Sequence, residues 1–167
     1  KTLASLSGFY YTDAEETSSY QKADLPEQTD LSLLDYADTA TDCTMEKGSE
    51  GITVSNLGAD PNVVFPGVAS CFADNDKLYG LSLTVDAPDE TEMAVYYQTE
   101  GDEGFSAEKV YTFKVTEDNR TWEHLVPGGI TELRVDVSSP VESAVINNFE
   151  LKSCDITESG YTALKES

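Results

Sequence analysis

The stretch from Leu78 to Val115, LYGLSLTVDAPDETEMAVYYQTEGDEGFSAEKVYTFKV, decides the fold. It contains three runs in which apolar and polar residues alternate, separated by two turn-forming segments. Successive side chains of a strand point to opposite faces, so each run buries one row of side chains and exposes the other. The rows predicted to be buried are Leu81, Leu83 and Val85, then Met93, Val95 and Tyr97, then Tyr111, Phe113 and Val115.

The same period of two recurs on both sides of this stretch. Further strands are predicted over 51–55, 62–65 and 121–125, over the row Leu133, Val135 and Val137, and over a last run with Val145, Phe149 and Leu151 on one face. Short segments rich in Gly, Pro, Asn and Asp stand between the runs and reverse the chain. These connections are too short to hold crossover helices, which excludes parallel α/β folds. The pattern predicts an all-β protein, an antiparallel β-sandwich or jelly roll.

The first 43 residues differ from the rest because they are rich in Thr, Ser, Asp and Glu. We expect residues 1–43 to be an acidic lead-in, in which Thr29 or Asp30 caps a short helix through Leu34 and Tyr36. The sandwich domain is predicted over 44–155, and 156–167 is expected to be a tail or linker. The chain starts at Lys1 without Met, which we interpret as a segment of a longer protein or a processed form.

The charge balance excludes two classes of partner. Among 167 residues there are 32 Asp and Glu against 10 Lys and Arg, a formal net charge of −22. Binding to a nucleic-acid backbone depends on Lys and Arg displacing counterions, so nucleic-acid partners are excluded. An anionic membrane surface would repel the chain for the same reason. No apolar run is long enough to span a bilayer, so we expect the segment not to be inserted in a membrane.

Three cysteines, Cys43, Cys71 and Cys154, allow at most one disulfide within the chain. No C-x-x-C pair occurs, which excludes zinc-ribbon and thioredoxin-like sites. Cys43 and Cys71 are the pair to test first, since a bridge across about 28 residues would stabilise the fold by roughly 3 kcal/mol. The alternative is three buried thiols that act as small hydrophobic side chains.

Several short motifs follow one another along residues 48–153. They are Gly58–Pro61, then Tyr96, Tyr97 and Phe105, then Trp122 before Leu125, and last the strands Leu133–Asp136 and Val145–Leu151. With these motifs, residues 48–153 resemble a β-sandwich of the galactose-binding-like, carbohydrate-binding-module type. More narrowly, the chain is similar to extracytoplasmic sandwich domains of bacterial cell-envelope glycosyltransferases. This resemblance implies a non-catalytic module outside the cytoplasmic membrane that binds or positions glycan, in a larger protein that is membrane-anchored.

One candidate glycan site follows from counting along two strands. Period two turns Tyr96 away from the buried row of Tyr97, and turns Arg134 and Asp136 away from Leu133 and Val135. If the two strands are neighbours, Tyr96, Arg134 and Asp136 form a polar patch with one ring, suited to sugar hydroxyls and a stacked pyranose. The alternative interpretation is a salt bridge beside a half-buried tyrosine.

A structural calcium ion is the one cofactor that the sequence allows, and none is required. Sandwich modules of the resembled type often hold Ca²⁺ through carboxylates and backbone carbonyls. Asp74 and Asp76 have the alternating spacing of such a loop, and Asp60 precedes the neighbouring strand. The alternative is an ordinary Asx turn at Asp74.

Catalysis has weaker support in the sequence. His124 is the only histidine, and a lone histidine between Glu123 and Leu125 is usually a partly solvated strand residue. Glycosidases need two carboxylates about 5 to 10 Å apart, and 32 acidic residues make such a pair inevitable. The sequence therefore favours a non-enzymatic carbohydrate-binding or positioning module. The alternatives are a structural or protein-interaction domain without sugar affinity and, third, a glycoside-active jelly-roll enzyme.

Overall fold

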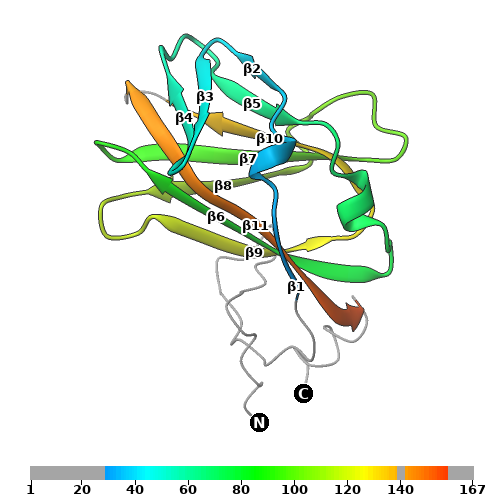
Figure 1. Ribbon diagram of the computed structural model, residues 1–167. Coiled ribbons are helices and arrows are strands. Elements are labelled where there is room, and N and C mark those ends of the chain that lie inside the picture. The colour runs from blue at the N-terminus through cyan, green and yellow to red at the C-terminus, as the bar shows by residue number, and fades with distance from the viewer. Residues whose placement is uncertain (1–28, 139–141, 158–167) are drawn as a thin grey trace.

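Two antiparallel β-sheets pack face to face in the computed structural model, which describes residues 29–138 and 142–157 (Figure 1). One sheet has the strand order β3-β4-β11-β6-β9, with β1 paired to β11, and the other has the order β2-β5-β10-β7-β8. The strands of the first sheet are β1 (Thr29–Ser32), β3 (Thr44–Gly48), β4 (Gly51–Ser55), β6 (Lys77–Asp86), β9 (Thr121–Pro127) and β11 (Ser143–Thr157). Those of the second are β2 (Thr39–Thr41), β5 (Asn62–Phe65), β7 (Thr91–Thr99), β8 (Val110–Val115) and β10 (Ile130–Val137). The predicted β-sandwich is confirmed.

The core lies between the sheets and contains most of the residues that the alternating pattern predicts, while Tyr97, Tyr111 and Phe113 are only partly buried against it. Leu81, Leu83 and Val85 of β6 and Leu133 and Val135 of β10 have no exposed surface. Across the core, the rings of Phe65 on β5 and Phe149 on β11 meet edge to face, with their centroids 5.0 Å apart. Aromatic pairs in this geometry stabilise a core beyond the apolar area that they bury. The contact between Phe65 and Phe149 therefore joins β5 of the second sheet to β11 of the first.

The prediction that Thr29 or Asp30 caps a short helix is wrong. Those residues lie in strand β1, which pairs with β11 along Thr29–Ser153 to Ser32–Glu150. Only one 3₁₀ turn follows, η1 (Leu34–Tyr36), and no side chain caps it. The reason is tertiary: Leu33 is fully buried and its backbone amide donates to the carbonyl of Phe149 at 2.7 Å. Pairing with β11 outweighs the local capping preference.

The sandwich also begins earlier in the chain than the composition suggests. β1 and β2 both precede residue 44, yet β1 extends one sheet and β2 pairs with β5 in the other. Residues 29–43 are therefore part of the sandwich in the described structure. The remaining lead-in, residues 1–28, and the tail from 158 lie outside the described residues.

One predicted buried residue faces the other way. Val145 was expected on the same face as Phe149 and Leu151, but Ala144 and Ile146 are buried in its place and Val145 is half-buried. The pairing of β11 with β6 shifts register between Ile146 and Asn148, which marks a β-bulge. A bulge inserts one residue and reverses the alternation beyond it. Strict period-two counting fails at this position for that reason.

Cys43 and Cys71 are free thiols and do not form the disulfide that the spacing suggested. The Cys43 thiol donates a hydrogen bond to the carbonyl of Asn62 at 3.6 Å, and burial raises its pKa. Cys154 lies in the part of β11 whose side chains are not described. Within residues 29–138 and 142–157, no helix has the length and apolar character needed to cross a membrane.

We predict that Phe149→Ala lowers the free energy of unfolding by about 3 to 5 kcal/mol, because it removes a fully buried ring and leaves a cavity opposite Phe65. Urea denaturation followed by tryptophan fluorescence measures the change. Thr112→Ala, at an exposed position of β8, is the control and should change stability by less than about 0.5 kcal/mol. Equal losses in the two variants would contradict the central role of this contact.

Candidate functional site

The outer face of the second sheet carries the candidate glycan patch. In β10, Leu133 and Val135 point into the core, so Arg134 and Asp136 project from the opposite face. Strand β7 lies beside β10, and its register sets Tyr96 directly opposite Arg134. The structure therefore brings Tyr96, Arg134 and Asp136 to one surface, as the counting along the two strands requires. Whether this surface binds a ligand stays a prediction.

Arg134 and Asp136 form a two-pronged ion pair. The Arg134 Nε donates to Asp136 Oδ1 at 2.7 Å, and Nη2 donates to Oδ2 at 3.0 Å. The arginine side chain is 21% exposed and the aspartate side chain 13%. Burial raises the pKa of Asp136, although the Arg134 guanidinium pulls it the other way. The carboxylate is thus held in place and partly stripped of water, with lone pairs left on both oxygens.

Two aromatic rings lie close to the Arg134 guanidinium. Its central carbon lies 4.3 Å from the centroid of the Tyr96 ring and 5.1 Å from that of Phe105. Both distances suit cation–π contacts. Phe105 comes from the loop between β7 and β8, not from a strand, so alternation could not assign it a side of the sheet. The only signal for it in the sequence was its place in the resemblance, after the acidic glycine loop.

The loop that carries Phe105 is held at its base by an ion pair between Lys109 and Asp102. Asp102 Oδ2 accepts hydrogen bonds from the Thr99 amide at 2.9 Å and from Lys109 Nζ at 2.6 Å. Lys109 Nζ also donates to Thr99 Oγ1 at 2.6 Å. The bonds from Lys109 and the Thr99 amide lower the pKa of Asp102. Both ends of the loop are therefore tied together, which sets the path on which Phe105 reaches the sheet.

The structure does not gather the three carboxylates suggested for calcium. Asp74 Oδ1 accepts the Asp76 amide at 3.0 Å, which is an Asx turn, and Asp74 Oδ2 lies 4.0 Å from Lys77 Nζ. The Asp60 amide instead donates to Asp42 Oδ2 at 3.2 Å. Among the described residues, no three His, Cys, Asp or Glu side chains are grouped so that they could hold a metal ion.

His124 is buried and lies in an aromatic cluster at the side of the sandwich where β8 and β9 are the outermost strands. Its ring centroid is 4.6 Å from that of Tyr111, and its Nδ1 is 2.7 Å from the carbonyl oxygen of Leu125. The Trp122 ring stacks on that of Phe113, with their centroids 4.9 Å apart, and is partly buried against the core. The expectation of a partly solvated histidine was wrong, since only 7% of His124 is exposed.

No protein-family model matches the chain, and no curated protein matches it in sequence. Solved structures do match in fold. The second N-terminal cellulose-binding domain of β-1,4-glucanase C from Cellulomonas fimi has a TM-score of 0.50 at 15% identity, over 79% of this chain and 94% of that one. The chain is thus similar in fold to a β-sandwich of the carbohydrate-binding-module type.

Two further solved structures align with lower scores. The C-terminal CBM6 module of LamC, a laminarinase from Zobellia galactanivorans, has a TM-score of 0.48 at 14% identity, over 76% of this chain and all of that one. The CBM6 module of lichenase 5A from Cellvibrio mixtus, solved with cellotriose, has a TM-score of 0.44 at 10% identity, over 76% of this chain and 98% of that one.

We predict that Asp136 and Asp102 titrate on opposite sides of the ordinary aspartate pKa. Asp136 has a raised pKa, so the stability linked to its protonation is present at low pH and is lost as the pH rises through the raised value. Asp102 has a lowered pKa, so its stabilising effect is present above the ordinary aspartate pKa and is lost as the pH falls through the lowered one. Carboxyl ¹³C NMR titration measures both, and a lower pKa for Asp136 than for Asp102 would contradict the assignment.

The suggested calcium site has not been tested, and thermal melting is the direct test. A ligand that binds only the folded state raises the melting midpoint. Because the Asp74 side chain is engaged in a turn and near Lys77, we expect the same midpoint in millimolar calcium and in excess chelator. A midpoint several degrees higher in calcium would establish a calcium site that backbone carbonyls help to build.

Proposed function

We propose that this domain is a non-catalytic module that binds a glycan chain on the outer face of the second sheet, around Tyr96, Phe105, Arg134 and Asp136. The observation that carries the proposal is the stack of Tyr96, the Arg134 guanidinium and Phe105, with Asp136 held beside it. Half-exposed rings supply apolar surface for the C–H face of a pyranose, and the ion pair supplies oriented polar atoms for its hydroxyls.

The arrangement leaves hydrogen-bonding capacity that a sugar would use. Nε and Nη2 of Arg134 are engaged by Asp136, and Nη1 donates to no other described residue. Each Asp136 oxygen accepts one bond from Arg134 and retains a second lone pair. A sugar hydroxyl both donates and accepts, so it matches a guanidinium N–H next to a carboxylate oxygen. Since these groups are already positioned in the free protein, little ordering is needed on binding.

Two neighbouring rows of side chains extend the patch across the sheet. One row crosses all five strands, with Thr39, Val64, Arg134, Tyr96 and Val110 aligned by the strand register. The next contains Thr41, Asn62, Asp136, Ala94 and Thr112. Asn62 is buried, at 5% exposed, but the short side chains of Ala94, Val110 and Thr112 on the β7 and β8 side of the central groups reach the surface and leave room for a ligand there. This favours an internal segment of a glycan chain as the occupant.

In this proposal the domain serves a larger glycan-handling protein of the cell envelope, outside the cytoplasmic membrane. The fold supports a binding module, since one solved structure of similar fold is a cellulose-binding domain of a Cellulomonas fimi β-1,4-glucanase. A net charge of −22 disfavours acidic polysaccharides, so the glycan we expect is uncharged.

A structural or protein-interaction domain without sugar affinity is the second candidate. It predicts either a contiguous exposed apolar patch or an unpaired sheet edge. Of the large hydrophobic side chains that the structure describes, only Leu31 counts as exposed, at 40%. The end strands of the described sheets, β3 and β9 in one and β2 and β8 in the other, are each paired on one side only, which is the feature that favours this candidate. The scarcity of exposed apolar surface favours a polar ligand over a protein partner.

We predict that Tyr96→Ala weakens glycan binding about tenfold, because it removes the ring that supports the guanidinium and contacts the sugar. Affinity electrophoresis in gels containing mixed-linkage β-glucan, laminarin or hydroxyethyl cellulose screens for a ligand, and calorimetry with the matching oligosaccharide measures the affinity. Arg134→Lys keeps the charge but not the fork, and should bind more weakly than the unaltered protein.

The matched control is Glu92→Ala, an exposed position four residues from Tyr96 on the same face of β7. It should leave both affinity and melting midpoint unchanged. If the protein melts cooperatively but binds none of the glycans in a broad panel, the proposal is refuted. Equal affinity of Tyr96→Ala and Glu92→Ala would place any sugar elsewhere on the domain.

A further inference from the structure

The outer face of the first sheet contains two buried leucines that do not belong to the core. Leu78 on β6 is 3% exposed and Leu125 on β9 is 1% exposed, yet neither joins the cluster of side chains between the sheets. Their chain neighbours Tyr79 and Val126 do belong to that cluster. Successive side chains of a strand point to opposite faces, so Leu78 and Leu125 project away from the core.

Strand register brings the two leucines together beside a glycine and a serine. Gly80 lies opposite Leu125, and Leu78 lies opposite Pro127, so the leucines are diagonal neighbours. Gly80 is buried, and Ser82 is only 7% exposed. An outward leucine on an end strand such as β9 is open to water unless something lies over it. The low exposure of these residues therefore requires a cover.

No described element lies over this part of the sheet. Every described strand belongs to one of the two sheets, and the second sheet packs on the core side of β6 and β9. Of the two described turns, η1 contacts β11 and η2 (Ala69–Phe72) contacts β10. The cover therefore comes from a part of the chain outside the described residues or from another molecule.

A carboxylate on the same face lacks a donor. Glu123 lies opposite Ser82 on the outward side of β9, and its Oε2 is buried without a hydrogen bond from any described residue. Buried polar atoms in native proteins are nearly always hydrogen-bonded. The cover therefore has to supply an N–H or O–H donor as well as apolar area. We call the surface formed by Leu78, Gly80, Ser82, Glu123 and Leu125 the β6–β9 face.

Residues 1–28 are placed to reach this face because they run directly into β1. Strand β1 pairs with β11, β11 with β6, and β6 with β9, so Asp30 and Leu125 lie in one row across four neighbouring strands (Figure 1). Three strand spacings separate the ends of this row, about 14 Å. An extended chain covers that distance in about five residues. The segment that precedes β1 is thus more than long enough to return over the β6–β9 face.

The first 12 residues have the composition that the β6–β9 face requires. Lys1 is their only charged side chain, and the acidic residues of the lead-in begin at Asp13. Residues 9–11 are Phe-Tyr-Tyr, three consecutive rings that can cover the two leucines. The two tyrosine hydroxyls are donors that suit the Glu123 carboxylate. Apolar area, donors and the absence of like charge therefore occur together in this segment.

We propose that residues 1–28 fold back over the β6–β9 face, with the rings of residues 9–11 on Leu78 and Leu125 and a tyrosine hydroxyl donating to Glu123. The other end of the chain offers less, since Tyr161 and Leu164 are the only large apolar residues after 157. The docked segment buries apolar area that β9 would otherwise present to water.

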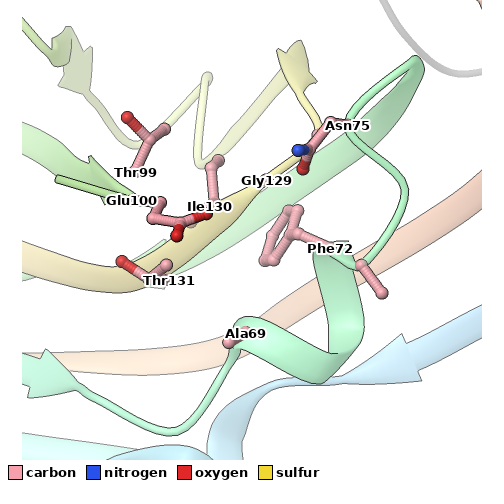
Figure 2. A pocket seen from close by; sticks show the side chains of 10 residues that line it. Ala69, Phe72, Asn75, Thr99, Glu100, Gly129, Ile130 and Thr131 are labelled. Carbon is pink, nitrogen blue, oxygen red and sulfur yellow. The ribbon is translucent and has the colours of Figure 1, made fainter.

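The β6–β9 face is separate from the cavity at one end of the sandwich. That cavity, of about 380 Å³, lies between η2, the loop at residues 73–76, the end of β7 and the start of β10. Figure 2 shows Asn75, Glu100 and Gly129 around it. None of its lining residues belongs to the β6–β9 face, and the glycan patch lies on the other sheet. The proposed docking therefore concerns a third surface of the domain.

The test measures the contact of leucine methyl groups with solvent by NMR. The full chain is labelled with ¹³C-leucine, and a soluble nitroxide such as TEMPOL broadens the signals of exposed methyl groups. Leu31, at 40% exposed, and Leu81, fully buried in the core, are the open and closed references in the same molecule. We expect the methyl signals of Leu78 and Leu125 to be protected as strongly as those of Leu81.

Serine substitutions in the proposed segment should open the face. In the triple variant Phe9→Ser/Tyr10→Ser/Tyr11→Ser, the methyl signals of Leu78 and Leu125 should broaden toward the level of the open reference, while the core reference stays protected. Protection of the core reference shows that the sandwich is still folded. Phe9→Ser alone, a milder change, should broaden the same two leucines in part.

The matched control changes the other end of the chain. Tyr161→Ser/Leu164→Ser removes the large apolar residues after 157 and should leave Leu78 and Leu125 protected. The unaltered protein is also measured at two concentrations. Protection by its own lead-in does not depend on concentration, whereas protection by a second copy does.

Urea denaturation supplies an independent measurement. Leu125→Ala should lower the urea midpoint of the unaltered chain, and should lower it much less in the triple serine variant, because the covering rings are already gone. Val85→Ala, at a fully buried core position of β6, should lower the midpoint equally in both backgrounds.

Any of four results overturns the proposal. The first is broadening of Leu78 and Leu125 in the unaltered chain that is as strong as that of Leu31. The second is protection that persists in the triple serine variant, together with equal effects of Leu125→Ala in both backgrounds. The third is loss of protection in the control variant, which would assign the cover to the C-terminal residues. The fourth is loss of protection on dilution, which would assign it to a second copy.

Discussion

The packing of Phe149 against Phe65 across the two sheets is the contact on which the rest of the structure depends. Phe149 lies on β11, which pairs with β1, β4 and β6, and Phe65 lies on β5, which pairs with β2 and β10. When these rings are buried, the side of every paired strand that faces the core is decided, because neighbouring side chains in a sheet share a face. The polar residues of the second sheet are turned outward by the same constraint.

The proposed function depends on the side chains that this constraint leaves on the outer face. Burial of Leu133 and Val135 forces Arg134 and Asp136 to the outer face, and the register between β10 and β7 then sets Tyr96 beside Arg134. An ion pair at such a place is partly dehydrated, which strengthens its hydrogen bonds and keeps its geometry well defined. The loop held by Asp102 and Lys109 adds the Phe105 ring, which lies close to the Arg134 guanidinium. Catalysis has no comparable support, since the one histidine is packed among aromatic rings.

The charge of the chain is compatible with the proposed glycan site. Described cations are mostly paired with nearby acids, as Lys109 is with Asp102, Lys114 with Glu90 and Arg120 with Asp86. The last two pairs are exposed and contribute little to stability. The excess negative charge keeps the surface soluble and repels anionic polymers, while an uncharged sugar is not affected by it. Hydrogen-bonding groups and ring faces therefore become the basis for recognition.

The alternation of apolar and polar residues correctly predicted which side chains are buried wherever a strand has one solvent-exposed and one buried face. The rows in β6, β7 and β10 were predicted from alternation alone, and so was the outward side of Arg134 and Asp136. Pattern failed where a distant partner set the conformation. Thr29 and Asp30 have the composition of a helix cap, but pairing with β11 makes them a strand. Val145 faces outward because of a bulge, whose extra residue leaves no mark in hydropathy.

The sequence by itself determined the β-sandwich, the buried rows and the candidate patch, because period-two alternation is a local property that each strand carries alone. Only the tertiary structure decided that Phe105 covers Arg134, that Asp60, Asp74 and Asp76 stay apart, and that Asn75, Glu100 and Gly129 meet around one cavity. These are meetings of loops and strands distant along the chain. They depend on which strands pair and where each loop crosses the end of a sheet, and no local preference encodes either.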